Sequence, residues 1–131
     1  MHITATELRS LSQNILAAHG FSKEHQHSIT ETLVTAQIDQ CHSHGVWRLL
    51  GIIDTLKHGK MDATASPVVT HEQGAIIKID AKLGAATTAL ALGLPKLIAK
   101  VKQSGIALLA VNHCVHFSAL WVEVEQLTRA G

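Results

Sequence analysis

Apolar residues recur three and four positions apart at the start of the chain, which is the spacing of one face of an amphipathic helix. Thr4 and Glu7 have the spacing of a capping box, in which each side chain accepts a hydrogen bond from the other residue's backbone N–H. Gly20 follows the last apolar position and predicts the end of this first helix. The apolar positions are Leu8, Leu11 and Ile15.

Two more helices are predicted before the pattern changes. Ser22 is a candidate N-cap for the second helix, which is expected to end near residues 39–42. The third helix is expected to run from about Gly45 to His58 and Gly59. The apolar positions are Ile29, Leu33 and Ala36 in the second helix, and Val46, Leu49, Ile53 and Leu56 in the third.

Beyond Asp62 the pattern indicates strands mixed with helices. Residues 68–72 and 75–80, separated by a Gln-Gly turn, predict a hairpin. Small residues predict a helix over 85–102, which Gly93 and Pro95 are expected to kink or restart. An unbroken apolar run over 106–111 predicts a strand buried on both faces, and 119–130 predicts a final amphipathic helix.

These elements predict the α/β class: a three-helix segment, then a hairpin, then the start of a mixed α/β domain. Few strands are available to bury the apolar run over 106–111. Gly131 stands where the residue after a helix end is expected, just as another strand would normally follow. We therefore expect this chain to be the front part of a longer, truncated protein.

Composition indicates a folded chain and disfavours several classes of partner. The 131 residues are 47% hydrophobic and 16% charged, which is typical of one globular domain with a core. A net charge of +1 without a basic block, and only 3% aromatic residues, argue against nucleic acid or an anionic membrane as partner.

Location is predicted to be cytoplasmic. The N-terminus lacks the basic and apolar regions of a secretory signal. Cys41 and Cys114 belong to no paired motif, which favours a reducing compartment. The most apolar window, residues 83–99, contains glycine, proline and lysine and falls short of a membrane span.

Ten histidines in so short a chain suggest candidate chemistry, first in the run His42-Ser43-His44-Gly45 with Arg48. On a helix starting here, His44 and Arg48 would share one face, and the positive end of the helix dipole would disfavour a protonated imidazole. An arginine fork suits a carboxylate, and Ser43 could share the proton of His44. A plain N-cap, a surface histidine and a solvated arginine are the alternative interpretation.

A second candidate group follows the predicted buried strand, where α/β sheets present ligands. His113 and His116 lie there, and residues 117–119 could begin a helix whose free N–H groups hold a phosphate. An ordinary loop is the alternative. A metal site is not predicted, because the chain has neither a cysteine pair nor an HExxH motif.

Three segments together resemble the malate/L-lactate dehydrogenase family, whose fold is not of the Rossmann type. They read HSHGVWRLLGIIDTLKHGKMDATASP, AIIKIDAKLG and SGIALLAVNHCVHFSALW. Within the family, the continuation of His116 and Phe117 by Ser118, Ala119 and Leu120 is most similar to reductases of cyclic imino acids, where other members more often have HFG. The resemblance implies reduction of Δ1-piperideine-2-carboxylate to L-pipecolate and of Δ1-pyrroline-2-carboxylate to L-proline.

The resemblance also implies roles for particular residues. Ser43 and His44 would form a proton relay with His44 as donor, and Arg48 would hold the substrate carboxylate. His116, Phe117, Ser118, Ala119 and Leu120 would line the site of NADP(H), with NAD(H) as the alternative cofactor. Residues 1–73 would form a helical domain carrying the SHG…R motif, and residues 74–131 the incomplete start of the NADP-binding domain. Full-length relatives are homodimers acting on small imino or 2-oxo acids.

Departures from the family pattern leave two other functions open. Leu50 and Ile52 stand where the family commonly has proline and tyrosine, so a candidate hydroxyl contact is missing. A relay aspartate and most of the cofactor domain lie beyond Gly131 in relatives, so the chain alone is expected to have little activity. The alternatives are a malate/L-lactate-type dehydrogenase and a non-catalytic helical interaction module left by gene truncation.

Overall fold

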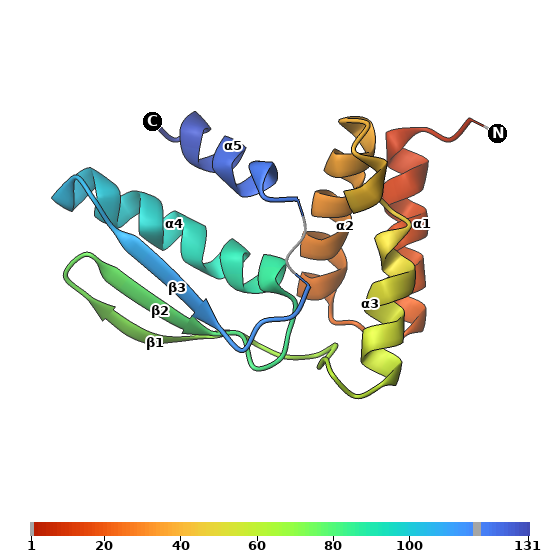
Figure 1. The fold of residues 1–131 in the computed structure, drawn as a ribbon, viewed down its shortest axis with the longest axis horizontal. Coiled ribbons are helices and arrows are strands. Elements are labelled where there is room, and N and C mark those ends of the chain that lie inside the picture. Colours follow the sequence, from red (N-terminus) through yellow and green to blue (C-terminus); the bar gives the residue numbers. More distant parts are fainter. Residues whose placement is uncertain (1, 117–118) are drawn as a thin grey trace.

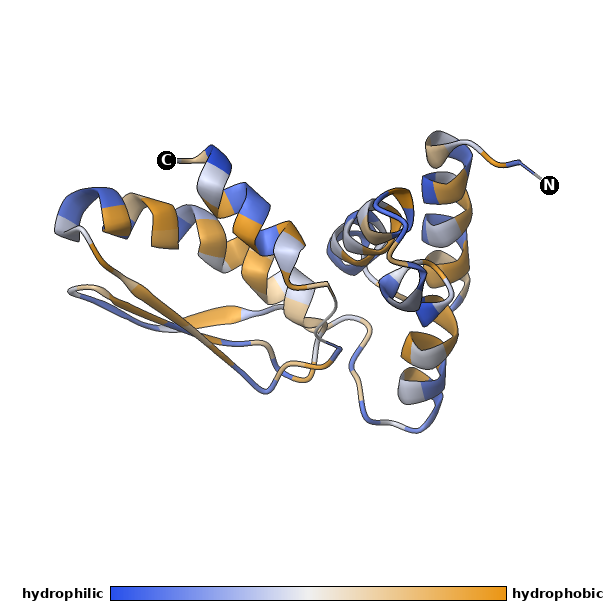
Figure 2. Ribbon diagram, turned by 45° about the horizontal axis from the view of Figure 1, so that its top comes forward, coloured by the Kyte–Doolittle hydropathy of each residue, from blue (hydrophilic) through white to orange (hydrophobic). Residues whose placement is uncertain are grey.

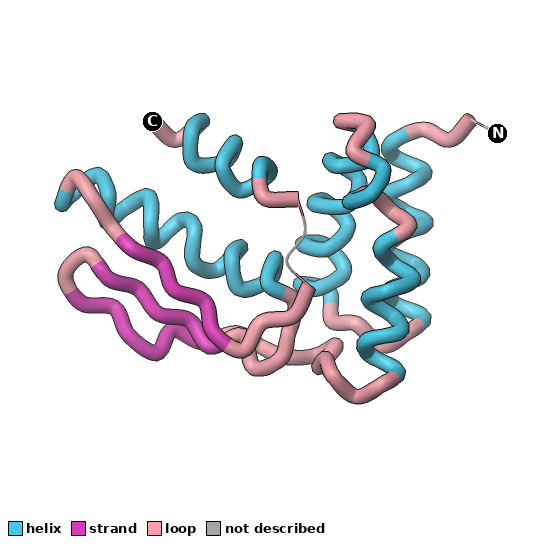
Figure 3. Tube along the Cα trace, in the orientation of Figure 1, coloured by secondary structure: helices cyan, strands magenta, loops and turns pink. Residues whose placement is uncertain are grey.

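A computed structural model describes residues 2–116 and 119–131 and shows a helical bundle beside a covered sheet (Figures 1 and 3). The bundle contains α1 (Ala5–Ala18), α2 (Lys23–Ile38) and α3 (Arg48–Lys57), with the short 3₁₀ helix η1 (His42–His44) between α2 and α3. The remaining elements are the strands β1 (Val68–Gln73), β2 (Ile76–Asp80) and β3 (Leu108–Asn112), and the helices α4 (Ala86–Ser104) and α5 (Trp121–Arg129). The α/β class is therefore confirmed.

The predicted capping signals form at the first two helices. The Thr4 hydroxyl accepts the Glu7 N–H, and the Glu7 carboxylate accepts the Thr4 N–H at 2.8 Å. The bond from the Thr4 N–H, and then a bond that the Thr4 hydroxyl donates to the same carboxylate at 2.7 Å, lower the pKa of the Glu7 carboxyl. Ser22 caps α2 by accepting the N–H of His25. The caps fix the starts of the two helices that pack most closely in the bundle.

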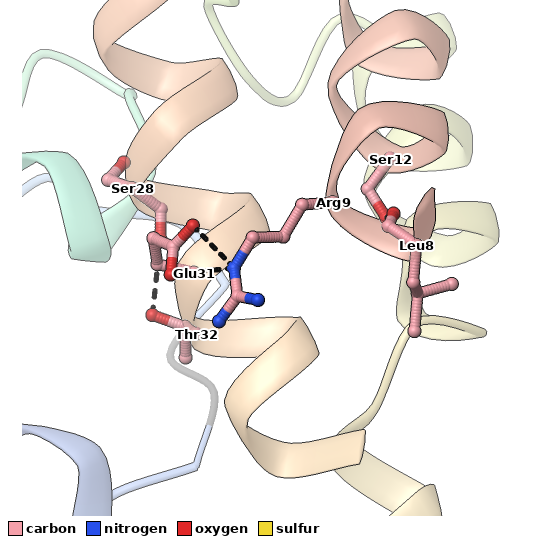
Figure 4. A network of polar contacts seen from close by, with 6 residues as sticks. All are labelled: Leu8, Arg9, Ser12, Ser28, Glu31 and Thr32. Carbon is pink, nitrogen blue, oxygen red and sulfur yellow. Dashed lines mark hydrogen bonds and ion pairs between the residues drawn. The ribbon is translucent and has the colours of Figure 1, made fainter. Parts of the chain in front are cut away.

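Polar contacts join α1 to α2 at the rim of their apolar interface (Figure 4). Arg9 Nε donates to both carboxylate oxygens of Glu31, at 3.1 and 3.2 Å. The hydroxyls of Ser12 and Thr32 each donate to the carbonyl four residues earlier on their own helix. The apolar core beneath includes Leu16, Phe21, Ile29, Leu33, Leu49, Ile52, Met61 and Ala85.

The sheet has the order β1-β2-β3, with β1 antiparallel and β3 parallel to β2. Alternation along β2 buries Ile77 and Ile79 and leaves Ile76 and Lys78 exposed, as a sheet covered on one face requires. The helix α4 covers the buried face, and α5 lies alongside α4 (Figures 1 and 2). The predicted hairpin is thereby confirmed, and its turn at Gly74 is also where the predicted domain boundary falls.

Two expectations about the sheet region are wrong. Of the two expected effects of Gly93 and Pro95, the restart does not occur, since α4 is one helix that continues to Ser104. The carbonyl that loses its N–H partner belongs to Ala91, and both Ala91 and Pro95 are exposed residues. The strand β3 is not buried on both faces, since Leu108 is 57% exposed. The reason is that α4 covers one face of the sheet, and Leu108 lies beside exposed Ile76 on the other face.

Within residues 2–116 and 119–131, no helix has the combined length and hydropathy that a membrane crossing demands.

Candidate active site

The joint between α2 and α3 carries the His-Ser-His-Gly motif and is organised by one glutamine. Gln37 Nε2 donates to His42 Nδ1 at 2.7 Å, and Gln37 Oε1 accepts the Val46 N–H at 3.4 Å. A Cβ at Gly45 would collide with the same Gln37 amide oxygen. A side chain at position 45 would therefore displace the Gln37 amide from its contacts with His42 and Val46.

Within this turn the two predicted relay residues are in contact. Ser43 Oγ lies 3.0 Å from His44 Nδ1, and the Cys41 thiol lies 3.6 Å from the same nitrogen. Because a serine hydroxyl can donate to Nδ1, this geometry allows Nε2 of His44 to carry the ring proton. Ser43 and His44 thus form a hydrogen-bonded pair in which Nε2 of His44 is available for proton transfer.

The predicted placement of His44 and Arg48 on one helix face is wrong. The helix α3 begins at Arg48, and His44 lies in η1, separated from it by the turn at Gly45. The two residues are connected through the backbone instead, because Arg48 Nε donates to the Ser43 carbonyl at 2.9 Å. The guanidinium carbon of Arg48 also lies 5.6 Å from the centroid of the Trp47 ring, within cation–π range.

Arg48 lines a small cavity between the bundle and the start of α4. The cavity has a volume of about 30 Å³ and includes His116 from the loop after β3. His44 is not among its lining residues, so the structure brings Arg48 together with His116 rather than with His44. The other lining residues are Ile29, Thr32, Leu33, Ile52, Met61, Ala85 and Thr87.

His116 is fixed by both backbone and side-chain contacts. The loop carrying it is attached to α4, since the Val115 carbonyl accepts the Ala86 N–H at 2.9 Å. Its backbone is left-handed, with φ of 53°, and its Nε2 lies 2.7 Å from Thr55 Oγ1. Burial and then the positive charge of Arg48 lower the pKa of His116, which favours the neutral imidazole.

The rest of the second candidate group is only partly described. Phe117 and Ser118 lie outside the described residues. Ala119 is buried and Leu120 is exposed, and α5 begins at Trp121 with Leu120 as its N-cap, two residues after the predicted start. The Val122 N–H donates to the Ala119 carbonyl at 3.3 Å, so these residues form a turn at the start of the helix. The predicted phosphate contact also involves residues 117 and 118 and stays a prediction.

Trp121 ties the far end of this loop to the His-Ser-His-Gly turn. Its indole N–H donates to Asp39 Oδ2 at 2.9 Å, and its ring lies edge-on to His44 with centroids 6.3 Å apart. The loop is thus held at His116 by α3 and at Trp121 by α2 and η1. His113, in contrast, is largely exposed and pairs with Asp80 Oδ1 at 3.1 Å.

Two of these contacts, Thr55–His116 and Trp121–Asp39, were not predicted from the sequence. Thr55 follows Arg48 and Ile52 at helical spacing, so its place on the cavity side of α3 was available from the pattern. The Trp121–Asp39 contact joins residues far apart in sequence and has no local signal. Among the described residues, no group of three or more histidine, cysteine, aspartate or glutamate side chains is placed to hold a metal ion.

Solved structures define the class of protein to which this architecture belongs. The crystal structure of Δ1-piperideine-2-carboxylate reductase from Pseudomonas syringae pv. tomato superposes with a TM-score of 0.92 at 36% identity, over 96% of this chain and 38% of that one. A putative malate/lactate dehydrogenase from E. coli superposes with a TM-score of 0.92 at 21% identity, over 100% and 37% of the two chains. The fold is that of the N-terminal part of these dehydrogenases.

Sequence comparison gives the family. Residues 3–131 match malate/L-lactate dehydrogenase, and the chain belongs to this family. The Δ1-pyrroline-2-carboxylate/Δ1-piperideine-2-carboxylate reductase of Pseudomonas aeruginosa is 49% identical over 131 residues, which are 100% of this chain and 39% of that protein. The chain therefore spans about two-fifths of the length of the relatives it matches.

The family implies a nicotinamide cofactor, which the cavity formed by this chain does not enclose. A volume of about 30 Å³ accommodates roughly one water molecule and not a nicotinamide ring. The side chains that line the cavity nevertheless fit such a site. Arg48 supplies a positive charge and His116 supplies ring nitrogens, next to mostly apolar lining residues. Arg48 and His116 thus line the same cavity with groups suited to one wall of such a site.

Proposed function

We propose that the protein carrying this chain is a reductase of cyclic imino acids, acting on Δ1-piperideine-2-carboxylate and Δ1-pyrroline-2-carboxylate with NADPH as cofactor. The observation that carries the proposal is the 49% identity, over the whole chain, to a reductase with both substrates in its name. The contact between Ser43 and His44 and the position of Arg48 on the cavity wall support it.

Arg48 would hold the carboxylate of the imino acid. Its Nε is already used by the Ser43 carbonyl, so the two terminal nitrogens of the guanidinium remain for a carboxylate. The Trp47 ring stacked near the guanidinium limits its motion. A bound carboxylate would therefore have a defined direction relative to the Ser43–His44 pair.

His44 would supply the proton in the reaction. With Ser43 Oγ donating to Nδ1, the proton on Nε2 is available to the substrate nitrogen. Ser43 can then pass its own proton to Nδ1 and, being exposed, take a replacement proton from solvent. The cofactor supplies hydride to C2 of the imine when bound. His116 and residues 117–120 would lie along the cofactor, and the remaining walls would come from the part of relatives that this chain does not span.

A chimera tests the proposal. Residues 1–131 would replace the matching N-terminal residues of the Pseudomonas aeruginosa relative, whose remaining chain supplies the missing walls. We expect NADPH-dependent reduction of both imino acids and slower or no reduction of pyruvate and oxaloacetate. Preference for the 2-oxo acids would overturn the imino acid assignment in favour of a malate/L-lactate-type enzyme.

Substitutions in the chimera test the individual roles. Replacing Arg48 by alanine is expected to raise the KM for imino acids by about 10- to 100-fold, the effect of losing a charged hydrogen bond. Replacing His44 by alanine is expected to lower kcat by about 100-fold or more. Arg129→Ala, on exposed α5, is the matched control. Unchanged turnover in both site variants would support a non-catalytic role for this region.

A further inference from the structure

Thr55 lies behind the histidine that faces the cavity. It follows Arg48 and Ile52 on α3 at positions that share one helix face, and both of those residues line the cavity. Its hydroxyl oxygen lies 2.7 Å from His116 Nε2. Thr55 thus contacts Nε2 of a residue that itself lines the cavity.

The hydrogen bonds of Thr55 determine which ring nitrogen carries the proton. The Thr55 hydroxyl donates to the Gly51 carbonyl at 2.8 Å, the usual back-bond of a helical threonine. A hydroxyl has one proton, so at the contact with His116 its oxygen accepts. Nε2 of His116 is then the donor. In a neutral imidazole the other nitrogen, Nδ1, must be an acceptor.

Two further observations favour a neutral and fixed ring. Arg48 lies close enough for its charge to oppose a second proton on His116, and burial acts in the same direction. The left-handed backbone at His116, with φ of 53°, costs energy for a residue with a Cβ and is maintained by the surrounding contacts. Such strain is concentrated at functional sites.

We propose that Thr55 is a positioning residue, which fixes His116 in the tautomer protonated at Nε2 and so presents Nδ1 as a hydrogen-bond acceptor on the wall of the Arg48 cavity. The acceptor would take a hydrogen bond from an N–H or O–H group of the bound substrate or cofactor, and that part rests on the proposed function. The tautomer is a property of this chain alone.

NMR of the 131-residue chain with ¹⁵N-labelled histidine tests the proposal. Long-range ¹H–¹⁵N correlations distinguish a protonated ring nitrogen from an unprotonated one. We expect His116 of the parent chain to show protonated Nε2 and unprotonated Nδ1. Thr55→Val, which removes the hydroxyl at nearly constant volume, should give a mixture of tautomers. Thr55→Ser should restore the parent spectrum, and Thr6→Val, at an exposed site on α1, should leave it unchanged.

Two results would overturn the proposal. One is protonation of Nδ1 in the parent chain, which would mean that the Thr55 hydroxyl donates to the ring. The other is an unchanged His116 tautomer in a folded Thr55→Val variant, with folding verified by the backbone amide spectrum. Since these measurements need no turnover, their failure is separate from failure of the reductase proposal, which the chimera tests.

Discussion

The helical bundle and the sheet differ in how each one buries its apolar residues. In the bundle, Leu16 and Leu33 are almost entirely buried, and the buried His25 ring has partners at both nitrogens. Among the described residues, the sheet is covered on the face under α4, while Ile76 and Leu108 on the other face are exposed. The bundle helices thus enclose a core between them, although Leu50 on their outer surface is exposed, whereas the sheet buries apolar residues on one face.

The candidate site lies where the bundle and the sheet meet, so its residues come from both regions. Arg48 belongs to the bundle, whereas His116 follows the edge strand β3. Their cavity is bounded on the bundle side by well-packed residues and is completed by the loop after β3. Truncation of apolar side chains should therefore lower the free energy of unfolding by different amounts in the two regions, and this difference can be measured.

Leu33→Ala in the bundle should have the largest effect. Leu33 is 2% exposed and packs among the core residues of all three bundle helices, so truncation leaves a cavity. We expect the free energy of unfolding to fall by about 3 kcal/mol, measured by urea denaturation. A loss below about 1 kcal/mol would mean that the bundle core can collapse around the cavity and is packed less rigidly than its burial indicates.

Gly84→Ala, at the junction between bundle and sheet, should come next. A Cβ there would lie 2.9 Å from both the Ala81 carbonyl oxygen and His25 Nε2, and 3.0 Å from Ala65 Cβ. None of these groups can move aside easily, so we expect a loss of about 2 kcal/mol.

Gly51→Ala is the control for this substitution. Gly51 lies on the exposed side of α3 with no heavy atom within 4 Å of an added Cβ. Alanine should stabilise the chain there by up to about 1 kcal/mol through helix propensity. A neutral Gly84→Ala beside a stabilising Gly51→Ala would show that the junction is loosely packed.

The pH dependence of stability should report on His25, which joins the two regions. Its Nε2 accepts the Ala85 N–H at 3.3 Å, which leaves Nδ1 as the protonated nitrogen facing Ser22 Oγ at 3.0 Å. Burial lowers the pKa of His25 below its ordinary value of 6.5, against a smaller opposing effect of Asp62 and Glu24. The unfolded chain therefore takes up the proton first as the pH falls.

The sign of the effect follows from this order of protonation. The contribution of His25 is fully present above pH 6.5, the pKa assumed for the unfolded chain, and is lost as the pH falls from there through the folded-state pKa. The slope should not exceed about 1.4 kcal/mol per pH unit for this one group. His116, whose pKa is also lowered, adds the same sign, and Glu123, whose pKa burial raises, opposes it.

His25→Gln separates His25 from those other groups. Glutamine can still accept the Ala85 N–H but does not titrate. The variant should therefore lose part of the slope between pH 6.5 and 4.5, the ordinary pKa values of histidine and glutamate. Urea denaturation at a series of pH values measures both chains. Identical slopes would show that His25 titrates in the folded chain as it does in the unfolded one.

The sequence predicted the bundle better than the sheet for a physical reason. Caps such as Thr4 and Ser22 and the helical apolar spacing are local, so α1 and α2 could be predicted closely. The burial of β3 depends on which elements cover each face of the sheet, and no pattern within residues 106–111 contains that information. The burial of His25 has no signal in the apolar spacing of α2, because it depends on contacts with Ser22 and with distant Ala85.

The same distinction holds within the candidate site. The motif around His44 and Arg48 correctly predicted that these residues lie at one joint. Their predicted placement on one helix face is wrong, because the turn at Gly45 packs against Gln37 and α3 begins only at Arg48. The position of His116 beside Arg48 depends on the sheet docking against the bundle. Such contacts between distant segments can be predicted only from the whole fold.

Leu108→Ala in β3 should have the smallest effect. Leu108 is 57% exposed on the uncovered face of the sheet, so truncation removes little buried area and should cost about 0.5 kcal/mol, against about 3 kcal/mol for the same change at Leu33. Urea denaturation at two protein concentrations checks this. A loss close to that of Leu33, growing with concentration, would mean that a second copy of the chain covers β3 in solution. The same loss at both concentrations would place another segment of the chain itself over that face. Either result would mean that both faces of the sheet are buried, so that the sheet would no longer differ from the bundle in this respect.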